Sequence, residues 1–91
     1  MKSKVFNCVI YTERRDVPVQ ITTTRVKSVN DYRDYTVPMY KNQEISKIME
    51  NWFFLPPRSV RLVHDEDGWR FVVSYRAGVI HLTVKSVVPV G

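Results

Sequence analysis

The chain has 91 residues, with 14 Lys and Arg against 9 Asp and Glu, so its formal net charge is +5. Apolar residues make up 44% and charged residues 25% of the chain, a composition typical of a folded protein and unlike that of a disordered one. The one cysteine, Cys8, excludes an intramolecular disulfide and a Cys-based zinc site, and no apolar stretch approaches the ~18 residues of a membrane-spanning helix, so we expect a cytoplasmic protein with no membrane partner.

The first part of the chain has the alternation of a β-hairpin. Residues 5–11 are rich in β-branched and aromatic side chains, and residues 17–27 alternate apolar and polar positions after a polar connection. The alternation changes phase after Thr24, because Arg25 and Lys27 occupy the parity that is apolar before it. The pattern therefore predicts two paired strands, with a bulge or a strand end near Thr24.

The middle of the chain predicts an irregular segment followed by one helix. Residues 28–40 have no clean period and are dense in tyrosine and charge, so we expect a loop or an irregular edge there. Asn42 is a favourable N-cap, and four apolar side chains follow it at the spacing of one helical face. Two prolines after Leu55 cannot continue a helix, which should end by about Phe54. The apolar positions of this face are Ile45, Ile48, Met49 and Trp52.

The last third of the chain predicts a three-stranded antiparallel meander. Apolar residues alternate over residues 60–64, 69–75 and 80–84, and turn residues separate these three runs. The predicted architecture is a single α+β domain over residues 1–91, with the element order β-β-α-β-β-β. It consists of one antiparallel sheet of about five strands with one helix packed on one face. A small β-barrel with one helix is the alternative.

Strand alternation predicts that the basic side chains of the meander share the face that points away from the helix. That face would hold four fixed positive charges, His81 and no carboxylate, since the acids lie in the connections. Such a surface suits a polyanion, because guanidinium groups bind phosphate through paired hydrogen bonds. We therefore expect a small non-enzymatic binding or regulatory protein that engages nucleic acid, either RNA or DNA. The phosphate contacts would come from Arg61, Arg70, Arg76 and Lys85, extended by Arg14, Arg15, Arg25 and Lys27.

Aromatic side chains at the margins of this face would stack on unpaired bases. The small size and the lack of catalytic motifs also suit a phage- or plasmid-encoded accessory protein. The aromatic residues concerned are Tyr11, Tyr32, Tyr35 and Trp69.

A second surface supports an alternative function. Residues 52–57 are too apolar for one helical face to bury, since Phe53 and Phe54 point about 100° and 200° away from Trp52 around a helix. Unless the monomer buries both, they form a patch of the kind that dominates protein interfaces. The alternative is a protein–protein adaptor or inhibitor with an acidic partner, and a homodimer through the patch or an edge strand is its simplest form. The interacting residues would be Phe53, Phe54, Tyr32 and Tyr35.

The chain contains few groups suited to catalysis. His64 and His81 fall on opposite faces of the predicted sheet, and we expect His64 to pair with Asp65 or Asp67. Cys8 alternates with apolar residues, as a small buried side chain does. The acidic run at residues 65–67 is expected to form a hairpin turn, and phosphate-binding and nucleophile motifs are absent. We therefore expect no cofactor, no metal ion and no catalytic residue.

The meander from Val60 to Val88 is similar in outline to that of the RelE-like toxin family, through its alternation and its basic residues. This resemblance implies a metal-independent ribonuclease, in which Arg, Lys, Tyr and His on a sheet hold and cleave RNA. The predicted N-terminal strands depart from the helical pair of that family. A small ribonuclease is therefore the remote alternative.

Overall fold

An antiparallel sheet of seven strands forms the body of the computed structural model, which describes residues 3–91. Helix α1 (Gln43–Phe53) and a short 3-10 helix, η1 (Met39–Lys41), lie between the fourth and fifth strands. The strands are β1 (Lys4–Tyr11), β2 (Asp16–Thr23), β3 (Arg25–Val29), β4 (Tyr32–Val37), β5 (Ser59–Asp65), β6 (Gly68–Tyr75) and β7 (Gly78–Pro89). Their hydrogen-bonded order is β2-β1-β7-β6-β5-β4-β3.

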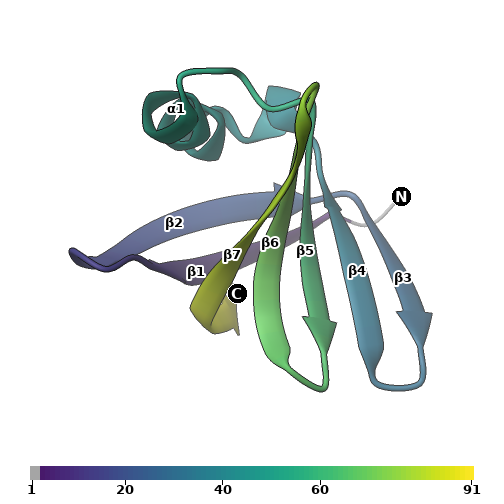
Figure 1. Cartoon of the computed structure of the whole chain (residues 1–91). Coiled ribbons are helices and arrows are strands. Elements are labelled where there is room, and N and C mark those ends of the chain that lie inside the picture. Colours follow the sequence, from purple (N-terminus) through teal and green to yellow (C-terminus); the bar gives the residue numbers. More distant parts are fainter. Residues whose placement is uncertain (1–2) are drawn as a thin grey trace.

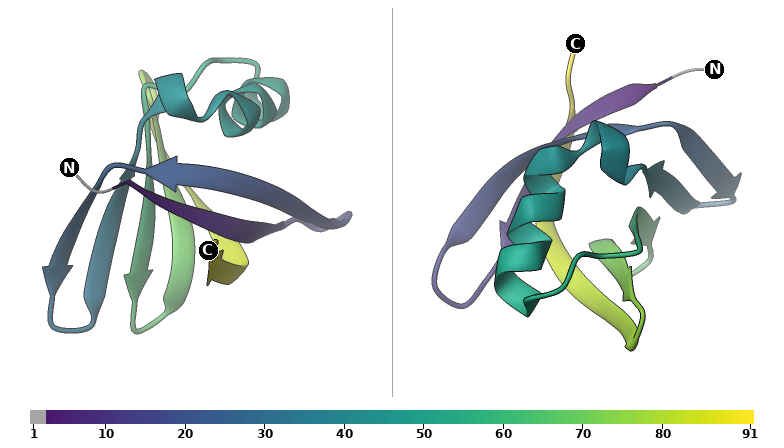
Figure 2. Two further views of the ribbon diagram at one scale, coloured as in Figure 1. Left: turned by 180° about the vertical axis from the view of Figure 1, so that it is seen from behind. Right: turned by 90° about the horizontal axis from the view of Figure 1, so that it is seen from above.

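The sheet coils into a half-barrel, and its two outermost strands are consecutive in the chain. Only Thr24 separates β2 from β3, and its N–H donates to the Thr36 carbonyl on β4 at 3.2 Å. β7 pairs first with β6 and later with β1, with a bulge at Lys85 near the point of transfer. Figure 1 shows that β1 and β2 cross β4–β7 as a second layer, with α1 at one end. The views from behind and from above show the same crossing (Figure 2).

The prediction of an α+β fold with an antiparallel sheet and one helix is confirmed, but the expected count of about five strands is wrong. The phase change near Thr24 divides the expected second strand into β2 and β3, and residues 28–40 contain β4 in place of a loop. The missed signal is the two-residue turn at Asn30 and Asp31. Asn30 has φ 53°, a left-handed conformation that Asn adopts more readily than most residues.

Helix α1 begins after Asn42 as predicted, but the Asn42 side chain does not cap it. Its Oδ1 accepts a hydrogen bond from the Thr22 N–H at 2.7 Å, and its Nδ2 donates to the carbonyls of Thr22 and Pro38 at 2.9 and 2.7 Å. Thr22 lies on β2, whose outer edge pairs with no other strand of residues 3–91. Asn42 is 4% exposed, so this buried amide ties the start of the helix to the edge of the sheet.

The core lies inside the half-barrel, and the parity predicted for the meander assigns its side chains correctly. Leu62, Phe71 and Val73 come from three positions of the predicted apolar parity and are fully buried. Ile45 and Met49 of the predicted helical face are also fully buried in this cluster. The apolar face of α1 therefore covers the inner surface of the sheet, as its spacing predicts.

Candidate functional site

Two arginines of the predicted basic face lie on the outer side of β5 and β6, but each is paired with a carboxylate. Arg61 donates through Nη1 to Oδ2 of Asp34, and Arg70 donates through Nη1 to Oδ2 of Asp65. The expectation of a face without carboxylates is therefore wrong. Asp34 belongs to β4, which the sequence did not predict as a strand, and Asp65 ends β5 and is not part of the turn.

Asp65 has an altered acidity because of these contacts. The hydrogen bond from Arg70 lowers the pKa of the Asp65 carboxyl, and a second hydrogen bond from the backbone N–H of Asp67, at 3.0 Å, lowers it further. The carboxylate therefore stays ionised at neutral pH and offsets the charge of Arg70.

Two valines beside these arginines on the outer face are buried. Val63 and Val72 lie outside the core cluster, yet they are 1% and 4% exposed. Val63 lies opposite Arg70 in the β5–β6 ladder, and Val72 lies opposite Arg61. Long aliphatic stems can cover apolar surface while their charged ends stay in water. We infer that these arginines have a packing role in addition to their charge.

The other predicted phosphate contacts are spread over separate parts of the surface. Arg76 lies in the turn between β6 and β7, and Arg14 and Arg15 lie in the turn between β1 and β2. Lys85 lies at the bulge of β7, where its Nζ is 2.8 Å from Oδ2 of Asp16. The structure does not bring these cations together with the arginines of β5 and β6 into one basic surface.

A pocket of about 420 Å³ lies where β1, β2, β3 and β4 meet. Lys4 and Thr23 face each other in the β1–β2 ladder, and the Thr23 hydroxyl donates to the Lys4 carbonyl at 3.0 Å. Arg25 and Tyr35 line the pocket from β3 and β4. Neither Lys4 nor Arg25 takes part in the three ion pairs found among residues 3–91. This Lys4–Arg25 pocket is lined by Ser3, Lys4, Thr23, Arg25, Val26 and Tyr35.

An aromatic cluster adjoins the Lys4–Arg25 pocket through Tyr35. The Tyr35 ring stacks on Trp69, with centroids 6.1 Å apart and planes 25° apart, and meets the Phe6 ring edge-on at 5.0 Å. The His64 ring, on β5 between these two strands, lies 4.5 Å from the Trp69 ring, and Lys4 Nζ lies 5.8 Å from the Phe6 centroid. Tyr35, His64 and Trp69 are all partly exposed. The cluster therefore presents ring surface to solvent next to two cations.

His64 belongs to this cluster and does not have the role expected from the sequence. No ion pair or hydrogen bond among residues 3–91 joins it to Asp65 or Asp67, and Asp65 is paired with Arg70 instead. His64 lies against Trp69 on the inner side, whereas His81 is exposed on the alternate parity of β7. The prediction that the two histidines lie on opposite faces is confirmed.

The residues of the predicted protein-interaction patch are divided between two regions. Phe53 packs against the core, whereas Phe54 is 87% exposed after the last turn of α1, as expected if the helix cannot bury both. Tyr35 lies in the aromatic cluster, and the Tyr32 hydroxyl lies 3.4 Å from Oδ2 of Asp34 on the same strand. The two tyrosines therefore belong to β4 and not to the end of α1.

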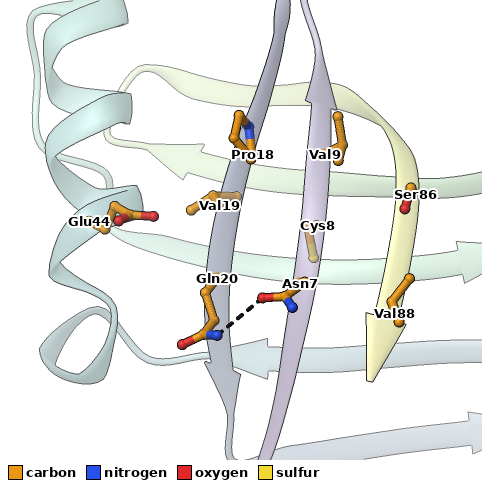
Figure 3. A pocket seen from close by; sticks show the side chains of 9 residues that line it. All are labelled: Asn7, Cys8, Val9, Pro18, Val19, Gln20, Glu44, Ser86 and Val88. Atoms are coloured by element: carbon orange, nitrogen blue, oxygen red, sulfur yellow. Dashed lines mark hydrogen bonds between the residues drawn. The ribbon is translucent and has the colours of Figure 1, made fainter. Parts of the chain in front are cut away.

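A second hollow, of about 250 Å³, lies over β1, β2 and the end of β7 (Figure 3). A hydrogen bond of 3.1 Å from Nε2 of Gln20 to Oδ1 of Asn7 crosses it. Its one charged lining residue is Glu44, which would repel an anion. Cys8 lies at its base, 1% exposed, and burial raises the pKa of this thiol to about 12. Cys8 is therefore the inert buried side chain that the sequence predicts.

Lys4 is not among the site residues predicted from the sequence, although the sequence contains a signal for it. A hairpin whose strands meet at Tyr11 and Asp16 places Lys4 opposite Thr23 when the register is counted backwards. Arg25 follows two residues later. The role of Tyr35 could not be obtained in this way, because it depends on how β4 lies beside β3.

No group of three or more His, Cys, Asp or Glu in residues 3–91 is arranged to hold a metal ion. In the same part of the chain, no helix is long and apolar enough to cross a membrane. No protein family model, curated protein or solved structure matches this chain. The case for a function therefore depends on the chemistry of the chain's own residues.

Proposed function

We propose that this protein binds single-stranded nucleic acid, with a base and its neighbouring phosphates held at the Lys4–Arg25 pocket. The observation that supports this proposal is the presence of Lys4, Arg25 and Tyr35 in one pocket, where neither cation is neutralised by a carboxylate. Cations bind phosphates and release counterions, and aromatic rings stack on bases whatever their sequence. The net charge of +5 adds a general attraction for polyanions.

Single strands fit this pocket better than a duplex does. The Lys4–Arg25 pocket is a hollow beside ring surfaces of the aromatic cluster, and bases in a duplex are stacked on one another and cannot offer a free face. The outer face of β5 and β6 is broad, but Asp34 and Asp65 offset its arginines. The predicted basic sheet face is thus less suited to phosphate than the pocket.

The experiment measures the fluorescence anisotropy of a labelled oligonucleotide of mixed sequence, tested as RNA and DNA and as single strand and duplex, over a series of salt concentrations. Binding to single strands should weaken with salt by about 0.7 log units per log unit for each phosphate contacted. Lys4→Gln and Arg25→Gln should each weaken binding and reduce this slope by about 0.7.

Lys47→Gln is the matched control, because Lys47 is exposed on α1 and takes no part in the ion pairs of residues 3–91. It removes the same charge and should leave the slope unchanged. An anisotropy that shows no binding of single strands at low salt, or a loss of affinity in the control as large as that in Lys4→Gln, would contradict the proposal.

Incubation with long RNA separates binding from cleavage. We expect the RNA to stay intact, since His64 packs against Trp69 and His81 lies on the opposite face. Cleavage that disappears in His64→Ala or His81→Ala would favour the ribonuclease alternative instead.

A further inference from the structure

The first half of β7 has an open edge. β6 pairs with it on one side, but β1 joins the other side only from Val84 onward. Residues 76–77 form a two-residue hairpin turn, and the residues flanking such a turn exchange backbone hydrogen bonds, with bonded pairs alternating along the ladder. Every second residue therefore bonds to β6. The backbone groups of Val79, His81 and Thr83 point to the open edge.

This edge lacks the protection found on the other two free edges. β2 contains Pro18 and is bonded at its rim by Asn42, and β3 carries Arg25 and Lys27. Prolines and charged side chains are common devices against strand addition. Residues 78–83 contain neither, and Val79 is 56% exposed. Among the described strands, this is the edge that is chemically open to another strand.

Two hollows follow the open edge of β7. One of about 310 Å³ lies beside Val79 and Ile80, and one of about 860 Å³ lies beside Leu82. Both are lined by Phe53 of α1, and the hairpin of β1 and β2, which lines the larger one, reaches beyond β7 on this side (Figure 1). Side chains two residues apart on a strand point to the same face, so neighbouring inward side chains of an added strand would enter the two hollows.

Two exposed apolar residues follow α1 beside the smaller hollow, which Phe53 and Leu55 line. Phe54 is 87% exposed and has φ 60° at the C-cap of α1, a conformation that costs a residue other than Gly about 1–2 kcal/mol. Leu55, which lines the hollow, is 53% exposed. Apolar exposure beside an open strand edge points to a docked polypeptide.

We propose that one extended segment of a partner protein adds to β7 at residues 78–83, paired through backbone hydrogen bonds. The segment has apolar side chains at alternate positions and an acidic residue beside the β1–β2 turn. The acidic preference follows because Arg14 and Arg15 outnumber Glu13 among the residues that line the larger hollow. This site is independent of the Lys4–Arg25 pocket, and it needs no nucleic acid.

A second copy of this chain fits the same space less well than a single segment. The β7 strand of a second copy would carry its own α1 and its own β1–β2 hairpin on the same side. These elements would have to enter a space that is already enclosed by α1 and the β1–β2 turn of the first copy. A lone strand brings no such elements.

The probe is a synthetic peptide of alternating valine and threonine with a glutamate at each end, titrated into the full chain and followed by amide NMR and hydrogen exchange. We expect saturable binding with shifts confined to residues 11–17, 52–55 and 78–83, and slower exchange at the amides of Val79, His81 and Thr83. The same peptide with N-methylated backbone amides should bind at least about tenfold more weakly, equivalent to ~1.4 kcal/mol. Lysine in place of glutamate should also weaken binding.

Two variants of the protein test the site from the other side. His81→Pro removes an edge N–H without removing a hydrogen bond to β6, and it should abolish binding while thermal unfolding confirms that the fold is kept. Leu55→Ser should weaken binding, whereas Val29→Ser, at a residue that is 55% exposed on β3, should not.

Three results would overturn the proposal. The first is the absence of saturable binding of the glutamate peptide. The second is binding that N-methylation leaves unchanged, which would show that backbone pairing is not involved. The third is a concentration-dependent dimer, measured by sedimentation, that His81→Pro dissociates, which would assign the open edge to a second copy.

Discussion

The guanidinium group of Arg61 on β5 donates a hydrogen bond to the carboxylate of Asp34 on β4. The side chains are 44% and 14% exposed, so the carboxylate is the more deeply placed partner. On its other side, Arg61 lies directly opposite Val72, which is 4% exposed. Arg61, which the sequence suggests for phosphate binding, thus forms an ion pair across two strands, and we infer that its stem covers Val72.

This double role predicts different effects for two substitutions of Arg61. Arg61→Ala removes both the ion pair and the aliphatic stem, and it should lower the free energy of unfolding by about 1 kcal/mol. Arg61→Met keeps most of the stem and should lower it by less. Urea unfolding of the two variants checks this. Equal losses in the free energy of unfolding would show that the aliphatic stem of Arg61 does not stabilise the protein by covering Val72.

Asn42→Ala should be strongly destabilising. It removes three hydrogen bonds of a side chain that is 4% exposed and leaves the edge groups of Thr22 without their partner. Breaking a buried hydrogen-bond network of this size costs about 2–4 kcal/mol. Asn51→Ala, at an exposed position of α1, is the control and should change the free energy of unfolding by less than about 0.5 kcal/mol. Urea denaturation measures both.

Phe54→Gly should stabilise the protein. Phe54 has φ 60°, and glycine adopts this conformation without the steric cost of a Cβ atom. The expected gain in the free energy of unfolding is about 1 kcal/mol, measured by thermal unfolding. Phe54→Ala keeps the Cβ atom and should bring no such gain. A destabilised Phe54→Gly would mean that the exposed ring makes a contact that stabilises the monomer.

The Asp65 carboxyl should contribute to the pH dependence of stability. Its folded pKa is lowered first by the hydrogen bond from Arg70 and then by that from the Asp67 N–H. A depressed folded pKa contributes stability that is present above the unfolded pKa of about 3.9 and is lost as the pH falls through the folded pKa. Asp65→Asn should therefore be less stable than the natural chain at neutral pH, and the difference should shrink in acid below about pH 4.

The pH experiment has a control in the same turn. Glu66→Gln removes an exposed carboxylate for which the structure gives no hydrogen-bond partner within residues 3–91. Its stability should follow that of the natural chain at neutral pH. An Asp65→Asn difference that persists unchanged in strong acid would show that the carboxylate charge is not its cause.

Cys8 should resist thiol reagents in the folded protein. It is 1% exposed, and burial raises its pKa to about 12, so almost no thiolate exists at neutral pH. Reaction with a chromogenic disulfide reagent should be complete only after denaturant is added. Rapid labelling in the folded state would show that the strands β1 and β2 open locally around Cys8.

The elements that the sequence predicts well are those whose pattern is complete within a short stretch. The meander alternates cleanly because Phe71 and Val73 face a continuous core, and the helical spacing of Ile45 and Met49 reflects one buried side. β4 was missed because its sequence shows no such alternation. Tyr35 and Val37 point inward, but Tyr32, Arg33 and Asp34 are also partly buried, so exposure does not alternate along the strand.

The candidate site was predicted in part. The sequence predicts Arg25 as a phosphate contact and Tyr35 as a base-stacking ring of the same basic face, and it also predicts Tyr35 as part of the protein-interaction patch. The two residues meet in the Lys4–Arg25 pocket because the chain breaks at Thr24. Before this break β2 pairs with β1, and after it β3 pairs with β4. The phase change in the sequence marks the break without giving its direction. The direction follows from the coiling of the whole sheet.

By itself, the sequence determined the α+β class, the hairpin, the helix and the residues that face the core, because periodicity is a local property of a strand or a helix. Only the tertiary structure decided which charges meet. Asp34 neutralises Arg61 because β4 lies beside β5, and Lys4 lies with Arg25 because β1 and β3 line the same pocket. Electrostatic pairing falls off over a few ångströms, so it depends on which strands are neighbours in space, and alternation along one strand carries no record of that.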